Sequence, residues 1–229
     1  MNENPFINIP VKKLNLLLKD IEDSQDDLKT KTIKKTLFNR YYEANIPVEY
    51  WTLNMKDFKG SNSLNSFYKE YSENIKTNYI NGKSNCLAGT HGVGKTFTST
   101  ALLKVALKHN YSALYTTLSE VVSLLTQAPN EKKYDGRVIL NTIDFLVLDE
   151  FDNRFMSTEN SIELYGRTLE SVFRTRSQNK LPTIMCTNSP NISEIFSGPL
   201  KDSLSSLMAG YLKVLPIFGE DFRKKELNG

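Results

Sequence analysis

Cysteine is scarce in this sequence, with two residues among 229. Cys86 and Cys186 each lie in a short apolar stretch, and their separation matches no metal-ligand spacing. We therefore expect two buried free thiols, and neither a disulfide nor a cysteine-based metal site.

Long hydrophobic runs are also missing, since no apolar stretch approaches the roughly 18 residues that a membrane helix needs. The first residues, Met-Asn-Glu-Asn-Pro-Phe, have neither the basic region nor the apolar core of a secretory signal peptide. These absences predict a cytoplasmic protein with no membrane partner.

Neither sign of charge dominates, because the formal net charge is +3 and the isoelectric point is about 8.6. This mildly basic balance permits a nucleic-acid partner without requiring one. Hydrophobic residues make up 39% of the chain and charged residues 24%, which is typical of a globular protein with a core. The length fits one large domain, or one domain with a small appendage.

Residues 89–96 read Gly-Thr-His-Gly-Val-Gly-Lys-Thr and match the phosphate-loop pattern of Gly, four variable residues, Gly-Lys and Ser or Thr. The glycines allow a tight bend in which backbone N–H groups point at a polyphosphate. Lys95 can reach the outer phosphates, and Thr96 can offer its hydroxyl to Mg²⁺ as it opens a helix. The residues predicted to bind the nucleotide here are Gly89, Thr90, His91, Gly92, Val93, Gly94, Lys95, Thr96 and Phe97.

The flanks of this loop supply the context that the motif requires. A mostly apolar strand is predicted at 84–88 and a helix at 98–109, so the loop joins a strand to a helix. The alternative is a glycine-rich turn that matches by chance. His91 fills a variable position, where a solvent-facing loop residue is a simpler interpretation than a phosphate ligand.

A second motif, residues 143–150, has four apolar residues that end in Asp149 and Glu150. Open parallel sheets place their ligands at the carboxyl ends of the strands, so both carboxylates are predicted to face the nucleotide. Asp149 would hold Mg²⁺, and Glu150 would orient and deprotonate the attacking water, as in a hydrolase. The alternative is a solvated strand end.

A third stretch, residues 181–188, is a buried strand with a polar tip. Asn188 is predicted to lie beside Glu150, where it could hydrogen-bond the hydrolytic water or the γ-phosphate. The alternative is a helix N-cap or turn residue, because Pro190 follows closely.

Strands alternate with helical segments along most of the chain, which predicts an α/β domain with a parallel sheet. The remaining strands are expected at 112–117 and 211–218. Further helices are expected at 61–80, 118–127, 135–141, 159–179, 192–196 and 199–208.

The first 36 residues are predicted to form a separate helical extension, and 37–229 the main domain. Residues 11–18 form an amphipathic helix, and a charged helix or linker follows. This extension either docks a protein partner or packs on its own domain. Residues 37–60 are expected to be irregular, with Trp51 as a core anchor.

The helix at 159–179 carries a set of cations on its surface. The alternatives are a solvated basic face, or contacts with a neighbouring subunit's nucleotide or a nucleic-acid backbone. The residues concerned are Arg167, Arg174, Arg176 and Lys180.

Together these motifs resemble the AAA+ helicase loaders of the DnaC/DnaI type and the related IstB transposition ATPases. The resemblance covers roughly residues 40–223. Its parts are the segments at 42–47, 89–96, 146–151, 182–188 and 219–223.

The resemblance implies a P-loop NTPase of the AAA+ (ASCE) type, with a five-stranded parallel sheet flanked by helices. It also implies binding of ATP and Mg²⁺, contact with single-stranded DNA, a homo-oligomer in the ATP state, and a replicative helicase as partner. The N-terminal extension would contact that helicase. Arg223 is expected as a second nucleotide sensor.

The chain departs from this family in one respect, because residues 198–207 contain no arginine where loaders usually carry one that acts on a neighbour's ATP. An arginine finger is worth about 10³ to 10⁵ in rate in GTPases. Either hydrolysis is slow, or Lys201, an arginine of 167–176 or a partner replaces it.

We therefore predict a slow, magnesium-dependent ATPase that loads a replicative helicase onto single-stranded DNA. Small loaders of this kind are typical of phage and plasmid replication, with which the Asn- and Lys-rich composition agrees. The first alternative is an IstB-like transposition helper that binds duplex DNA. The second is a nucleotide-dependent adaptor with little turnover.

Replacing Lys95 with alanine is expected to abolish measurable ATP binding, because it removes the cation that reaches the outer phosphates. Equilibrium titration with a fluorescent ATP analogue measures this loss. Unchanged nucleotide affinity in Lys95→Ala would contradict the assignment of the site.

Overall fold

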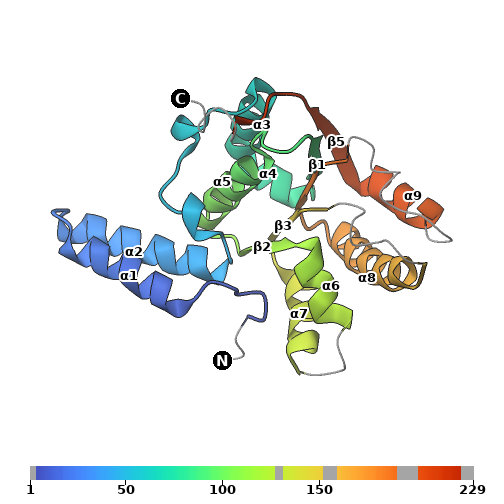
Figure 1. Cartoon of the computed structure of the whole chain (residues 1–229), viewed down its shortest axis with the longest axis horizontal. Helices are drawn as coiled ribbons and strands as arrows, with labels where there is room; N and C mark the ends of the chain where they lie inside the picture. Colours follow the sequence, from blue (N-terminus) through green and yellow to red (C-terminus); the bar gives the residue numbers. More distant parts are fainter. Residues whose placement is uncertain (1–3, 127–130, 152–158, 190–200, 223–229) are drawn as a thin grey trace.

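Five short strands pair in parallel to form one sheet in the order β2-β3-β4-β1-β5 (Figure 1). The computed structural model describes residues 4–126, 131–151, 159–189 and 201–222. This sheet confirms the predicted α/β class and strand number. The strands are β1 (Ser84–Gly89), β2 (Ala113–Thr117), β3 (Phe145–Asp149), β4 (Thr183–Thr187) and β5 (Leu212–Ile217).

The strands between β2 and β5 are buried on both faces, which explains why they read as nearly continuous apolar runs. Along β3, Phe145 and Val147 belong to one core cluster, whereas Leu146 and Leu148 belong to the other. The edge strand β5 instead exposes Lys213 and Val214.

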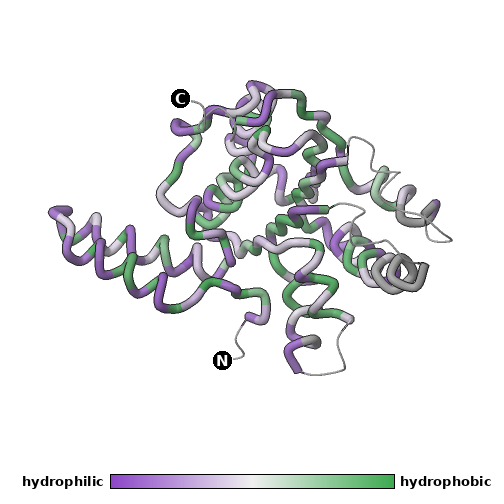
Figure 2. The backbone as a smooth tube through the Cα atoms, in the orientation of Figure 1, coloured by the Kyte–Doolittle hydropathy of each residue, from purple (hydrophilic) through white to green (hydrophobic). Residues whose placement is uncertain are grey.

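Helices cover both faces of the sheet, so the molecule has three layers (Figure 1). Helices α3, α4 and α5 lie on one face of the sheet, and α6 to α9 lie on the other. Apolar residues are concentrated in the strands and on the helix sides that face them (Figure 2). The helices are α3 (Asn62–Glu73), α4 (Ile75–Ile80), α5 (Lys95–Lys108), α6 (Leu118–Thr126), α7 (Glu131–Thr142), α8 (Glu159–Gln178) and α9 (Lys201–Tyr211).

The N-terminal extension is a helical hairpin that projects beyond the sheet at its β2 end (Figure 1). Helix α1 (Val11–Asp23) packs on α2 (Leu28–Glu43), whose N-terminus is capped by Asp27 through a 2.9 Å hydrogen bond from the Thr30 amide. Helix α2 runs through the predicted domain boundary at residues 36 and 37.

Several predicted boundaries differ from the structure. The segment 37–60 is less irregular than expected, because 37–43 belong to α2 and the 3₁₀ helices η1 (Val48–Tyr50) and η2 (Met55–Asp57) follow. The single helix predicted at 61–80 is two, because the Asn74 side chain donates to the carbonyl of Glu70 and the chain turns there. The predicted helix at 192–196 lies outside the described residues.

Two core predictions are confirmed. Trp51 is buried, and its indole N–H donates to the Ile46 carbonyl at 2.7 Å. Both cysteines are buried free thiols, and burial raises the pKa of Cys86 to about 12, so this thiol stays neutral near pH 7. Among the described helices, none is both long and apolar enough to cross a membrane.

Lys104 connects helix α5 to the end of η1 and the residues that follow it. Its ammonium donates to the carbonyls of Tyr50, Trp51 and Leu53 at 2.7, 3.1 and 2.5 Å, and lies 5.3 Å from the centre of the Tyr41 ring. Burial lowers the pKa of Lys104 from 10.5 to about 8. The segment is therefore held by a buried cation on the helix that starts at the phosphate loop.

We expect Lys104→Met to remove a pH dependence from the free energy of unfolding. Between pH 8 and 10.5 the unfolded chain binds the Lys104 proton more tightly than the folded protein does. The contribution of Lys104 to the free energy of unfolding therefore rises with pH in this range. Relative to Lys104→Met, the wild type should gain roughly 1 kcal/mol per pH unit in this range. Urea unfolding at pH 8, 9 and 10 measures the difference.

Lys12→Met, on the exposed surface of α1, is the matched control and should not change this slope. A difference between the wild type and Lys104→Met that stays constant from pH 8 to 10 would contradict the assignment.

Candidate functional site

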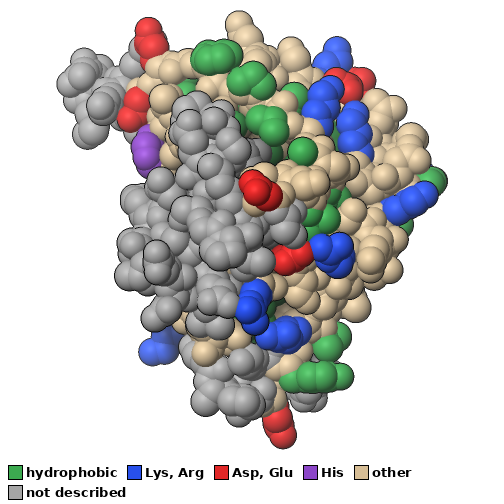
Figure 3. Space-filling model, turned by 90° about the vertical axis from the view of Figure 1, so that its right-hand side faces the viewer, with side chains coloured by type: hydrophobic (Ala, Val, Ile, Leu, Met, Phe, Trp, Pro, Cys, Tyr) green, Lys and Arg blue, Asp and Glu red, His purple; other side chains and the backbone are tan. Residues whose placement is uncertain are grey.

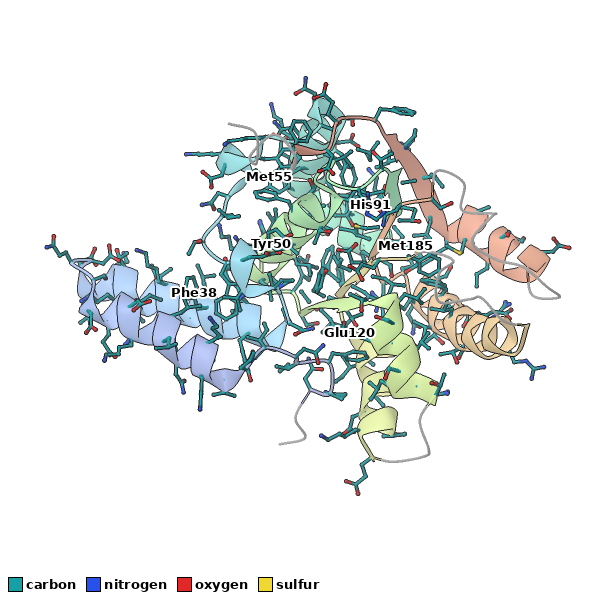
Figure 4. All side chains as sticks on the ribbon, viewed as in Figure 1. Phe38, Tyr50, Met55, His91, Glu120 and Met185 are labelled. Carbon is teal, nitrogen blue, oxygen red and sulfur yellow. The ribbon has the colours of Figure 1, made fainter. Side chains whose placement is uncertain are left out.

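The site is a cavity of about 800 Å³ at the carboxyl ends of β1, β3 and β4. Because β4 lies between β1 and β3, the residues that follow these three strands are brought together. Figure 4 labels His91 in the phosphate loop, and Tyr50 and Met55 in the facing 3₁₀ helices. Nine residues predicted from the three motifs line the cavity: His91, Gly92, Gly94, Lys95, Thr96, Phe97, Asp149, Glu150 and Asn188.

Three other predicted residues of the loop do not line the cavity. The Val93 side chain is fully buried in the core. Gly89 and Thr90 contribute their carbonyl oxygens to the hydrogen bonds of Lys95 described below. Arg223 lies outside the described residues.

The phosphate loop has the backbone geometry that the glycines were expected to allow. Gly92 and Gly94 have φ values of +74° and +98°, which residues with a Cβ rarely adopt. Gly94 is the N-cap of α5, and no side chain caps this helix. The N-terminus of this helix therefore favours an anion at the loop.

A Cβ at either glycine would collide with a neighbour. At Gly94 it would meet the Phe58 ring, and at Gly92 the Asp221 carboxylate. The amide of Phe222 donates to the Gly92 carbonyl at 3.1 Å, so the motif at 219–222 lies against the loop.

The Lys95 ammonium is held at the bottom of the loop, and 7% of this residue is exposed. It donates to the carbonyls of Gly89 and Thr90, both at 2.7 Å, and to Oδ1 of Asn188 at 3.0 Å. A buried cation needs such acceptors. The same ammonium can exchange these oxygens for those of a phosphate group.

Asp149 and Glu150 end β3 in different environments. Asp149 is buried, and its two oxygens accept hydrogen bonds from the Tyr115 hydroxyl at 2.9 Å and the Glu150 amide at 2.7 Å. Glu150 is exposed and has a φ of +51°, a conformation that is uncommon outside glycine and often marks functional residues. The first carboxylate is thus fixed, and the second is open to water.

Asn188 follows β4 and lies between the loop and the acidic pair. Its contact with Lys95 places the side chain in the cavity. The side chain that forms a hydrogen bond within this turn is that of its neighbour Thr187, whose hydroxyl accepts from the Ser189 amide at 3.0 Å.

The motifs did not identify an aromatic wall on the opposite side of the cavity. The Phe97 ring lies 6.0 Å from Tyr50 and 5.2 Å from Phe58, measured between ring centres. All three line the cavity, together with Leu53. The cluster of aromatics in residues 50–58 was the sequence signal for this wall.

The expectation of a basic face on α8 is wrong for one of its members. Arg176 is fully buried, and its guanidinium donates to the Thr183 hydroxyl at 2.8 Å and to the carbonyls of Leu140 and Pro182, each at 2.7 Å. This arginine therefore joins α8 to α7 and β4. The face that includes α8, α9 and β5 shows Lys and Arg in separate small groups, several beside acidic side chains (Figure 3).

The arrangement fits a nucleotide with Mg²⁺. Thr96 and Asp149 line the same cavity and offer a hydroxyl and a carboxylate, the oxygen ligands that Mg²⁺ prefers. No group of three or more His, Cys, Asp or Glu side chains in the described ranges could hold a metal by itself. A metal shared with phosphate oxygens suits such a sparse donor set.

The family model for IstB-like ATP binding proteins matches residues 22–226 of the chain. No protein with a curated description matches by sequence. Solved structures share the fold: DnaI superposes with a TM-score of 0.61 at 18% identity, covering 76% of this chain and 93% of that one.

Two further structures are similar. The DnaC helicase loader superposes with a TM-score of 0.61 at 20% identity over 75% of this chain and 100% of that one. The replication initiator DnaA, bound to AMPPCP and single-stranded DNA, gives 0.58 at 18% identity over 80% of this chain and 56% of that one.

We expect Gly94→Ala to weaken ATP binding about tenfold or more, because a Cβ strains the backbone and displaces Phe58 at the cost of at least about 1.4 kcal/mol. Titration with a fluorescent ATP analogue measures the affinity. Gly210→Ala is the matched control, since a Cβ there meets nothing within 4 Å. Equal affinity in the two variants would contradict the role given to the loop geometry.

Proposed function

Because this chain belongs to the family of IstB-like ATP binding proteins, we propose that it is a magnesium-dependent AAA+ ATPase that helps to place a replicative helicase on single-stranded DNA. One observation carries the ATPase part of the proposal. Lys95, Thr96, Asp149, Glu150 and Asn188, from three separate motifs, meet in one cavity of a size that suits a nucleotide.

The chain's own residues would act as follows when ATP is bound. Lys95 moves from the carbonyls of Gly89 and Thr90 to the outer phosphate oxygens, and the first N–H groups of α5 bind the same anion. Thr96 and Asp149 would hold Mg²⁺, and the metal would neutralise part of the phosphate charge.

Glu150 is the general base of this mechanism. Its exposed carboxylate takes a proton from the water whose oxygen attacks the γ-phosphorus, as the bond from that phosphorus to the leaving ADP oxygen breaks. The fixed carboxylate of Asp149 is less suited to this task, because both of its oxygens already accept hydrogen bonds.

Asn188 is the sensor of the nucleotide state. Its amide oxygen accepts from Lys95 at 3.0 Å, so movement of the lysine to a phosphate releases this amide. The released side chain can then contact the γ-phosphate or the attacking water. Asn188 directly follows β4, which runs between the two motif strands.

Hydrolysis is proposed to be slow, because the segment at 198–207 has no arginine for a neighbouring active site. The Arg176 guanidinium is buried in the core, so this residue does not replace the arginine. Lys201, Arg167 and Arg174 remain candidates for this role in a neighbouring copy, and an arginine from the partner could also raise the rate.

The loader part of the proposal is supported by the sequence motifs and by the fold shared with DnaI and a DnaC helicase loader. The fold shared with DnaA, solved with single-stranded DNA, agrees with a single-stranded DNA partner. We further propose that residues 1–36 contact the helicase, because α1 leaves Val11 and Leu16 more than half exposed. A homo-oligomer in the ATP state completes this proposal.

The main alternative is a transposition helper of the IstB type that binds duplex DNA, which the family match also supports. An adaptor with little turnover is the second alternative, favoured by the missing arginine. The three functions differ in the DNA that is bound and in the need for hydrolysis.

The test uses the purified full chain, ATP·Mg²⁺, circular single-stranded DNA and the replicative helicase of the same host. We expect the wild type to increase the amount of helicase that sediments with the DNA, and Lys95→Ala to fail. Glu150→Gln should keep ATP binding while hydrolysis falls by about 10² or more, since general base catalysis contributes this much.

Failure of the wild type to retain helicase on the circles would contradict the loader proposal. Preferential binding of long duplex DNA would then support the transposition helper. Normal retention by the wild type without detectable hydrolysis would support the adaptor.

A further inference from the structure

Tyr115 makes a contact that none of the sequence motifs predicts. It belongs to β2, which pairs with β3, and its hydroxyl donates to Oδ2 of Asp149 at 2.9 Å. Both side chains are buried, with 8% of Tyr115 and 5% of Asp149 exposed. We propose that Tyr115 is a positioning residue that orients the Asp149 carboxylate for Mg²⁺, and this inference rests on the proposed ATPase site.

The hydrogen bonds of Asp149 explain how the hydroxyl would act. Each carboxylate oxygen has two acceptor positions, and one on each oxygen is used, by Tyr115 and by the Glu150 amide. The two donors fix the rotation of the carboxylate and leave one position on each oxygen for a metal or its water. Without the Tyr115 donor, the adjacent backbone amide would be the one remaining hydrogen-bond donor to this carboxylate among the described residues.

The ring of Tyr115 does not itself require the hydroxyl. The ring packs in the core cluster on the α5 face of the sheet, where phenylalanine would fill the same apolar space. The Tyr115 hydroxyl is the donor of this hydrogen bond, and phenylalanine at this position would remove the donor.

Strand β2 is held in place at Tyr115 by the segment that follows α2. The Tyr115 amide donates to the Ala44 carbonyl at 2.8 Å, and the Asn45 side chain donates to the Tyr115 carbonyl at 3.1 Å. Asn45 is buried, has a φ of +51°, and accepts the amide of Asn8 at 3.0 Å. Both backbone groups of Tyr115 are therefore fixed by the N-terminal part of the chain.

These contacts form a continuous path from Asn8 through Asn45 and Tyr115 to Asp149. Residues 44–45 belong to the segment 42–47, for which the sequence predicted no chemical role. Through Tyr115 they would help to position the proposed metal ligand Asp149. Loss of a hydrogen bond to a metal-binding side chain commonly changes metal affinity 10- to 100-fold.

The same fold contains a matched control. Tyr79 is also partly buried, and its hydroxyl donates to a carboxylate oxygen of Asp144 at 2.7 Å. Asp144 precedes β3 whereas Asp149 ends it, so the two pairs lie at opposite ends of one strand. Tyr79→Phe therefore removes an equivalent hydrogen bond far from the cavity.

The experiment measures the dissociation constant of ATP in EDTA and in excess Mg²⁺ for the wild type, Tyr115→Phe and Tyr79→Phe. In the wild type, Mg²⁺ should strengthen binding. In Tyr115→Phe this enhancement should fall about tenfold, or disappear, while affinity in EDTA changes less than about twofold. Tyr79→Phe should behave as the wild type under both conditions.

Three results would overturn the inference: an unchanged Mg²⁺ enhancement in Tyr115→Phe, an equal loss of affinity in EDTA and in Mg²⁺, or the same shift in Tyr79→Phe. Melting temperatures of the two variants separate a folding defect from a metal effect. If the wild type binds no ATP under either condition, the proposed function fails together with this inference. A wild type that binds ATP normally leaves only the role of Tyr115 in question.

Discussion

The Lys95 ammonium joins the carboxyl ends of β1 and β4 through three hydrogen bonds, to two loop carbonyls and to Asn188. A buried cation is tolerated only where acceptors surround it, so the loop and the end of β4 must stay close together. The strand order supplies the remaining constraint, because β4 separates β1 from the acidic end of β3. The carboxylates are thus brought to the edge of the sheet where the lysine lies.

Parts of the chain that precede the phosphate loop also hold this site in place. Lys104 fixes the carbonyls of residues 50, 51 and 53, and Tyr50 and Leu53 form one wall of the cavity. Asn45 and Ala44 fix strand β2 at Tyr115, which contacts Asp149. The aromatic wall therefore depends on the contacts of Lys104 in α5, and the acidic end of β3 depends on residues 44–45 through Tyr115.

The positions of the motif residues in the fold could be predicted from the sequence, because their proposed chemistry requires particular residue types at fixed spacing. The glycines at 92 and 94 have the positive φ values that the loop needs, and β3 ends at Asp149 as expected. The three motifs line one cavity because parallel strands end at the same edge.

Contacts between distant segments could not be predicted in the same way. Tyr115 has an apolar ring in a strand, and nothing local distinguishes it from a tyrosine whose hydroxyl contacts solvent. Arg176 has the spacing of a surface residue of α8, but the carbonyls of residues 140 and 182 surround it in the fold. The sequence leaves open a helix or a linker after residue 18 because this stretch is highly charged, and packing against α1 stabilises helix α2 there.

We propose that ATP binds in this cavity, with its phosphates at the phosphate loop and its base near the aromatic wall. Photolabelling of the wild type with 8-azido-ATP and Mg²⁺, followed by peptide mapping, can locate the bound nucleotide. We expect label on peptides from residues 50–60 or 89–97, and loss of that label when ATP is added in excess. Specific, ATP-protected label confined to other parts of the chain would contradict it.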